Sequence, residues 1–239
     1  ARELPHEESE LILLSQSLKD CGRDMVLSLS PGPALIEKAE LYKQTSNMWR
    51  ITDDFWDSWS QLYDMFDRAR QWCIHTGHGC YPDADMLPIG PIKQDYDPAL
   101  RTEFTQDEQI TMMSLWSIFR SPLIIGGEMT GFDDFTMGLI TNEEILKMHR
   151  NARHSHPVWQ KLIDGTEHIL WTAVSSEGGQ YAAIFNTDEK DSEIRIPLED
   201  LEIYHSVRST ELWSGQTAEA IETINVSLKK HGAAVFYLS

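Results

Sequence analysis

The chain has 239 residues, of which 41% are hydrophobic, and a formal net charge of −18 at pH 7. A chain of this length can bury a sizeable core and is long enough for two domains. It carries no basic stripe that could meet phosphate, which argues against nucleic-acid and anionic-membrane partners. No apolar run reaches the length of a membrane span, and no signal peptide is recognisable.

The first part of the chain alternates helical and extended segments. Apolar residues at helical spacing predict helices at 7–19, 34–42, 56–72, 107–119 and 143–151. Short apolar runs that end in Gly, Pro or acids predict strands at 25–30, 48–52, 79–82 and 122–126, with a long irregular loop over 88–104. Four strand–helix alternations make half of an eightfold α/β barrel.

After about residue 156 the pattern changes to short runs of alternating polar and apolar residues. These runs are 168–174, 181–186, 193–196, 206–212, 220–226 and 233–238, and Gly- and Asp-rich turn signals separate them. They predict an antiparallel all-β domain of about eighty residues. We therefore expect a barrel part at 1–155 and a β-sandwich at 156–239, packed directly because no linker separates them.

Acidic residues follow two of the predicted strands. Arg50, Asp53 and Asp54 end the second strand, and Asp85 follows the third. The C-terminal ends of neighbouring parallel strands face one mouth, so these side chains and Ser30 are expected to ring one pocket. Two packing positions, Phe119 and Leu123, are expected to stay outside it. An arginine beside an acid holds the carboxylate ionised or anchors a polar substrate. Alternatively, Asp53 and Asp54 cap the next helix.

Five motifs occur in a fixed order along the first part of the chain. They are Trp49-Arg50 with Asp54 four residues after the arginine, Pro82-Asp83-Ala84-Asp85-Met86-Leu87-Pro88-Ile89-Gly90, Met112 to Trp116, Ser121-Pro122-Leu123 and Asn142-Glu143-Glu144-Ile145. This ordered series resembles glycoside hydrolase family 27, which contains the α-galactosidases and α-N-acetylgalactosaminidases. The resemblance covers roughly residues 20–155. The β-rich tail resembles the C-terminal antiparallel domain of that family in position and pattern.

The resemblance implies a retaining glycosidase mechanism with a pair of carboxylates. By motif position, Asp54 is the general acid/base, Arg50 binds substrate, and Asp85 and Met86 line the sugar pocket. Trp49 is the tryptophan best placed to stack on a sugar ring, although packing inside its strand is an equal alternative.

The loop that reads the sugar 2-substituent departs from the family pattern. It contains Pro and Gly here, with no aromatic residue and no acid. Its Ser30 is small, which in this family leans toward room for a 2-acetamido group, and the sugar specificity stays open.

The family nucleophile is an Asp at the end of the fourth barrel strand, and the matching portion of this chain begins after that strand. We therefore expect strands 5 to 8 of a (β/α)8 barrel followed by the antiparallel β domain. The remaining half would belong to a longer chain or to a separate one. The expected function is part of a retaining hydrolase of terminal α-linked galactose-like sugars, inactive alone. The alternative is a non-catalytic carbohydrate-binding relative.

The expected partners are a carbohydrate substrate and the missing N-terminal half of the barrel, with no nucleic acid and no membrane. By family resemblance the protein is secreted or periplasmic, or lysosomal in a eukaryote.

The cysteine and histidine patterns predict neither a metal nor a cofactor. The three cysteines have no zinc-site spacing, and Cys73 and Cys80 either form a short bridge or remain free thiols. His149, His154 and His156 gather near the domain junction without the spacing of a helix-borne metal pair.

Overall fold

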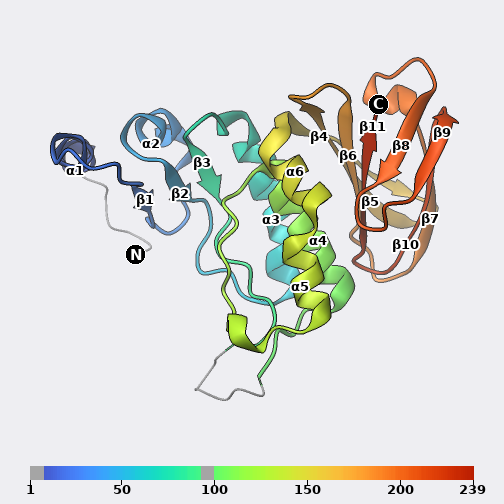
Figure 1. Cartoon of the computed structure of the whole chain (residues 1–239), viewed down its shortest axis with the longest axis horizontal. Coiled ribbons are helices and arrows are strands. Elements are labelled where there is room, and N and C mark those ends of the chain that lie inside the picture. Colours follow the sequence, from blue (N-terminus) through green and yellow to red (C-terminus); the bar gives the residue numbers. More distant parts are fainter. Residues whose placement is uncertain (1–7, 93–99) are drawn as a thin grey trace.

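The computed structural model describes residues 8–92 and 100–239. Glu7, predicted to open the first helix, and residues 93–99 of the predicted long loop lie outside the described residues. A small parallel sheet and the first two helices lie at one end of the molecule, the other helices occupy the middle, and antiparallel strands form the other end (Figure 1).

The first part consists of three short strands and six α-helices, counted over the described residues. The strands are β1 (Ser28–Leu29), β2 (Met48–Arg50) and β3 (Tyr81–Asp83). The helices are α1 (Glu8–Asp20), α2 (Ala39–Thr45), α3 (Trp59–Trp72), α4 (Gln106–Phe119), α5 (Asp134–Thr141) and α6 (Glu143–Asn151). Short 3₁₀ turns are η1 (Ile36–Lys38), η2 (Cys73–His75) and η3 (Met129–Gly131).

The three strands pair in parallel in the order β1-β2-β3. The predicted fourth strand at 122–126 forms only a single parallel bridge, between Leu87 and Ile125. Two backbone bonds flank it, from Leu87 N to Ile124 O at 2.7 Å and from Gly126 N to Leu87 O at 2.9 Å. The predicted alternation of helices with parallel strands is therefore confirmed for three strands. The segment 122–126 makes too few ladder hydrogen bonds to count as a fourth strand.

The predicted helix at 34–42 is shifted toward the C-terminus. It opens as the 3₁₀ turn η1, and α2 continues to Thr45. Helix α5 was not predicted, because its sequence is short and contains Gly138, a poor helix former.

The second part is antiparallel, as predicted. Its larger sheet has the order β4-β5-β6-β11-β8-β9, and β10 and β7 form a second sheet. The strands are β4 (Ala152–Ile163), β5 (Thr166–Ser175), β6 (Gln180–Asn186), β7 (Ser192–Pro197), β8 (Val207–Glu211), β9 (Thr217–Ile221), β10 (Thr223–Leu228) and β11 (Ala233–Leu238), with the 3₁₀ turn η4 (Leu198–Leu201). Strand β4 was not predicted, and it runs across residue 155.

The larger sheet is buried on both faces because its side chains alternate between two cores. On β5, Trp171 packs into the core shared with the helices, whereas Leu170 packs into the core between the two sheets. Phe119 is buried in the first of these cores and Leu123 packs against it, so both occupy packing positions as expected.

A buried histidine joins the two parts of the molecule. His231 precedes β11, and its ring stacks on Trp59 of α3 with centroids 3.6 Å apart. Its Nδ1 lies 2.7 Å from Glu108 Oε1 on α4, and its carbonyl accepts a 2.6 Å hydrogen bond from the Thr111 hydroxyl. The sheet is thus fixed to the helices by directional bonds as well as by apolar packing.

His231→Ala should lower the free energy of unfolding by about 2–4 kcal/mol, because it removes the stacked ring and leaves the Glu108 carboxylate without this partner. Urea unfolding followed by tryptophan fluorescence measures the change. The control is His205→Ala at an exposed position, which should change stability little. Equal changes in the free energy of unfolding for the two substitutions would contradict the role of His231 in joining the sheet to the helices.

Within the described residues no helix is long and apolar enough to span a membrane.

Candidate active site

The side chain of Arg50 gathers residues from the ends of all three parallel strands. Its Nη2 donates to Asp54 Oδ1 at 2.9 Å and lies 3.2 Å from Asp85 Oδ2. Its Nη1 donates to Ser30 Oγ at 3.4 Å. The structure therefore brings Ser30, Arg50, Asp54 and Asp85 together, as the strand-end pattern predicted.

The members of this group differ strongly in exposure. The side chains of Arg50 and Asp85 are 14% and 15% exposed, whereas that of Asp54 is 83% exposed. A pair shielded from water interacts more strongly than a solvated one, so Asp85 is the firmer partner of the guanidinium. Asp54 is free to face a ligand from the solvent side.

Asp85 is held by its backbone as well as by its side chain. It adopts a left-handed conformation, with φ of 77°, which is uncommon for a residue with a Cβ. Its Oδ2 accepts a 2.8 Å bond from Phe55 N, and its carbonyl accepts a 3.0 Å bond from Trp116 Nε1. Backbone conformations of this kind persist where neighbouring contacts over-determine them, often at functional sites.

A buried acid beneath the group was not recognised as a site residue from the sequence. Asp83 ends β3 and is 3% exposed, and its Oδ1 accepts a 2.8 Å bond from Asp85 N. Burial raises the pKa of the Asp83 carboxyl, and the charge of Asp85 adds to the rise. Asp83 therefore acts as a positioning residue for Asp85, and the acid–Ala–acid spacing at the strand end was its only sequence signal.

The acids after β2 do not cap the helix that follows. Helix α3 begins at Trp59, and its N-cap is Ser58, whose Oγ accepts from Gln61 N at 3.4 Å. The capping alternative for Asp53 and Asp54 is therefore wrong. Asp54 lies in the β2–α3 loop, where it pairs with Arg50.

Trp49 is not part of the group around Arg50. It is fully buried, stacks on Tyr42 with centroids 5.9 Å apart, and lies 6.0 Å from the ring of Trp72. These contacts place its side chain among α2 and α3, on the side of the sheet opposite to the Arg50 side chain. They favour packing inside the strand over sugar stacking.

Met86, the other predicted pocket residue, lies against Gly126, next to the parallel bridge between Leu87 and Ile125. A Cβ added to Gly126 would lie 2.5 Å from Met86 Sδ and 2.8 Å from its Cγ. The position of Met86 therefore depends on the absence of a side chain at Gly126.

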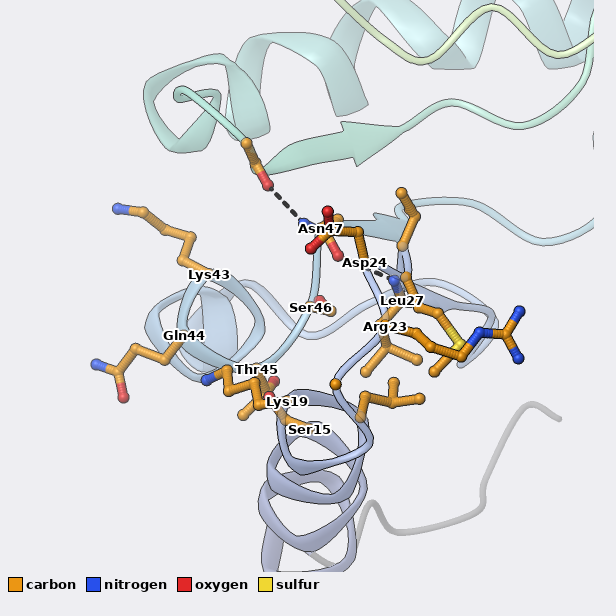
Figure 2. A pocket seen from close by; sticks show the side chains of 15 residues that line it. Ser15, Lys19, Arg23, Asp24, Leu27, Lys43, Gln44, Thr45, Ser46 and Asn47 are labelled. Carbon is orange, nitrogen blue, oxygen red and sulfur yellow. Dashed lines mark hydrogen bonds between the residues drawn. The ribbon is translucent and has the colours of Figure 1, made fainter.

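A cavity of about 730 Å³ lies at the other end of the parallel strands. Its lining includes Leu27, Asn47 and Gly79, which come before β1, β2 and β3. Figure 2 shows the Asn47 amide bridging two of these segments: it accepts from Leu27 N at 2.9 Å and donates to Gly79 O at 3.3 Å. These bonds connect the segments that precede β1, β2 and β3. Asp54 and Asp85, the acids predicted to form the site, lie at the opposite ends of the strands.

Neither a disulfide nor a metal centre adds to the site in the described part of the chain. Cys73 and Cys80 are both free thiols, and burial raises the pKa of Cys73. No group of three or more His, Cys, Asp or Glu side chains there could hold a metal ion.

The comparisons with known proteins agree on one family. The model for alpha galactosidase A matches residues 3–151, and that for the alpha galactosidase C-terminal beta sandwich domain matches residues 165–238. A GH27 β-L-arabinopyranosidase from Geobacillus stearothermophilus is 40% identical, with a TM-score of 0.90 over 97% of this chain. The chain belongs to glycoside hydrolase family 27.

Two α-galactosidases from eukaryotes are similar at lower identity. The α-galactosidase of Oryza sativa subsp. japonica is 22% identical over 228 residues, which are 95% of this chain and 52% of the rice protein. α-Galactosidase D of Emericella nidulans is 24% identical over 197 residues, which are 82% of this chain and 28% of the fungal protein. The chain also spans only 54% of the Geobacillus enzyme.

Gly126→Ala should displace the Met86 side chain, because the new Cβ cannot share space with Sδ. The measurement is the chemical shift of the Met86 methyl group in a methionine-labelled sample. Gly138→Ala in α5 is the control, since a Cβ there meets nothing within 4 Å. An unchanged Met86 signal in Gly126→Ala would show that the methionine is not held where the structure has it.

Proposed function

We propose that the chain forms strands 5 to 8 of a family 27 (β/α)8 barrel, at 1–155, followed by a β-sandwich at 156–239. Three observations support the barrel half: the parallel order β1-β2-β3, the parallel bridge from Leu87 to Ile125, and the helices between them. The remainder of the barrel would come from the part of the family fold that this chain does not span.

Exposed apolar side chains beside the first and the last segment of the parallel sheet support the proposal that further strands pack there. Val26, just before β1, is 71% exposed. At the other end, Ile124 and Ile125 are 41% and 37% exposed. Strand edges with exposed apolar residues invite pairing with further strands. In this proposal the N-terminal half of the barrel is the partner that covers them.

The proposed activity is retaining hydrolysis of terminal α-linked galactose-like sugars. The observation that carries it is the single guanidinium shared by Asp54 and Asp85 at the strand ends. In this mechanism Asp54, the exposed carboxyl, protonates the leaving oxygen and later activates water. The attacking carboxylate would belong to the other half of the barrel, so this chain alone would have no turnover.

Arg50 and Asp85 would hold the hydroxyls of the sugar ring. Their paired, partly buried groups have fixed orientations, and directional bonds to ionised groups distinguish one epimer from another. Met86 would contribute an apolar wall beside them, and Ser30, bonded to the same guanidinium, would face the sugar from the end of β1.

β-L-Arabinopyranosides form a second candidate substrate class. The Geobacillus relative at 40% identity is a β-L-arabinopyranosidase. A β-L-arabinopyranoside presents the ring hydroxyls of an α-galactoside but lacks the hydroxymethyl group, so one set of polar partners could bind both. The non-catalytic alternative keeps the same pocket without turnover, and only activity of the complete protein separates it from the hydrolase.

Asp54→Asn in the complete enzyme should reduce kcat about 10²–10⁴-fold on glycosides with poor leaving groups. The loss should be smaller on a dinitrophenyl glycoside, whose leaving group needs no protonation. Initial rates on α-galactosides and β-L-arabinopyranosides measure both effects.

Asp53→Asn is the matched control, since it makes the same change one residue away and should cost far less. A larger loss of kcat in Asp53→Asn than in Asp54→Asn would contradict the assignment of Asp54 as the acid/base. Lack of turnover of both sugars by the unaltered complete protein would favour the carbohydrate-binding alternative.

A further inference from the structure

A second cavity, of about 560 Å³, lies where the helical part meets β4. One wall is the turn that follows η2, with Thr76 and His78. The other walls are Arg120, at the end of α4, and the start of β4, with Arg153 and Ser155. This cavity is separate from the Arg50 group and takes no part in the proposed hydrolysis.

Its lining is cationic in a chain whose formal net charge is −18. Arg120 and Arg153 both line it, and no Asp or Glu does. Among the described residues neither guanidinium has a carboxylate within 4.0 Å, in contrast to Arg50, Arg101 and others. Burial lowers the pKa of Arg120, and the nearby charge of Arg153 lowers it further. Two like charges held together without an acid attract an anion.

Both arginines are fixed in place by other contacts. Arg120 Nε donates to His149 O at 3.2 Å, and its guanidinium lies over the Tyr81 ring. Arg153 uses Nη1 alone for two 2.8 Å bonds, to the carbonyls of Arg150 and Ala152. A guanidinium that is already oriented loses little freedom when it binds a ligand.

Two hydroxyl groups in the lining lack partners. Thr76 Oγ1 and Ser155 Oγ are buried, and neither has a hydrogen-bond partner in the described structure. Buried hydroxyls are nearly always satisfied, and an unpaired one can indicate an absent ligand. The lining therefore contains unsatisfied hydroxyl groups as well as guanidinium groups.

A β-bulge sets the position of Ser155. The pairing of β4 with β5 shifts between Arg153 and His156, which leaves His154 and Ser155 outside the regular ladder. His154 has a φ of 53°, in the left-handed region. Bulges redirect side chains, and this one places Ser155 in the cavity lining beside Arg153.

We propose that this cavity binds a tetrahedral oxyanion, either inorganic phosphate or a phosphomonoester. The lining offers guanidinium groups and hydroxyl donors together, which match phosphate oxygens, and it offers no carboxylate that would repel them. His78, His154 and His156 are exposed at its rim and add further donors. The site lies between η2 and β4, so an anion there also links the helical part to the larger sheet.

Isothermal titration of the full chain with inorganic phosphate, and separately with glucose 6-phosphate, tests the proposal. Sodium chloride at matched ionic strength is the blank. Saturable binding of one equivalent of either phosphate compound is expected, because both present the same oxyanion. Arg153→Gln should weaken binding at least tenfold, since a charge-assisted pair is lost. Arg195→Gln on the exposed face of β7 makes the same charge change and should leave binding unaltered.

Ser155→Ala provides a second variant if Arg153→Gln does not fold, as judged by circular dichroism. It removes one donor and should weaken binding several-fold. No saturable binding of either compound would overturn the proposal, as would equal affinities of Arg153→Gln and Arg195→Gln, or unchanged affinity of Ser155→Ala. None of these outcomes depends on glycosidase activity, so failure here leaves the proposed hydrolase function untouched.

Discussion

One guanidinium organises the carboxyl ends of the parallel strands. Arg50 stands at the end of β2, and its two terminal nitrogens reach side chains that follow β1, β2 and β3. Two carboxylates this close would repel one another without the cation between them. Since the Arg50 and Asp85 side chains are mostly shielded from water, removing either partner would leave the other charge poorly compensated. The loop that carries Asp54 therefore depends on Arg50 for its position.

The meeting of Asp54 and Asp85 could be predicted because parallel strands end at one edge and both acids follow strands. The burial of Trp49 follows from the same geometry: side chains alternate along a strand, so an outward Arg50 sends its neighbour into the helices. The left-handed conformation of Asp85 could not be read from the sequence, since Trp116, distant in the chain, holds its carbonyl. The role of Asp83 had only the acid–Ala–acid spacing as a signal, because that role depends on its burial and on its bond to Asp85 N.

In the antiparallel part, the predicted runs 168–174, 181–186, 193–196, 206–212 and 233–238 each coincide with one strand. The predicted single run at 220–226 was wrong, since it spans the end of β9 and the start of β10, which are separated at Glu222. Strand β4 escaped prediction because it is only partly buried, contains Pro157 and is interrupted by a bulge. These features erase the period of two on which strand prediction depends. The same bulge places Ser155 in the lining of the cationic cavity, so the least predictable strand carries the second candidate site. The β part is also fixed to the helices at His231, which contacts the first turns of α3 and α4.

Arg50 holds Asp85, and through it the β2–α3 loop. The Phe55 amide reports on this most directly, since it donates to Asp85 Oδ2 at 2.8 Å. Hydrogen exchange of that amide should be at least about tenfold faster in Arg50→Gln than in the unaltered chain. Arg70→Gln, on the exposed face of α3, should leave it unchanged. Unchanged protection of Phe55 in Arg50→Gln, or equal loss in both variants, would contradict the account.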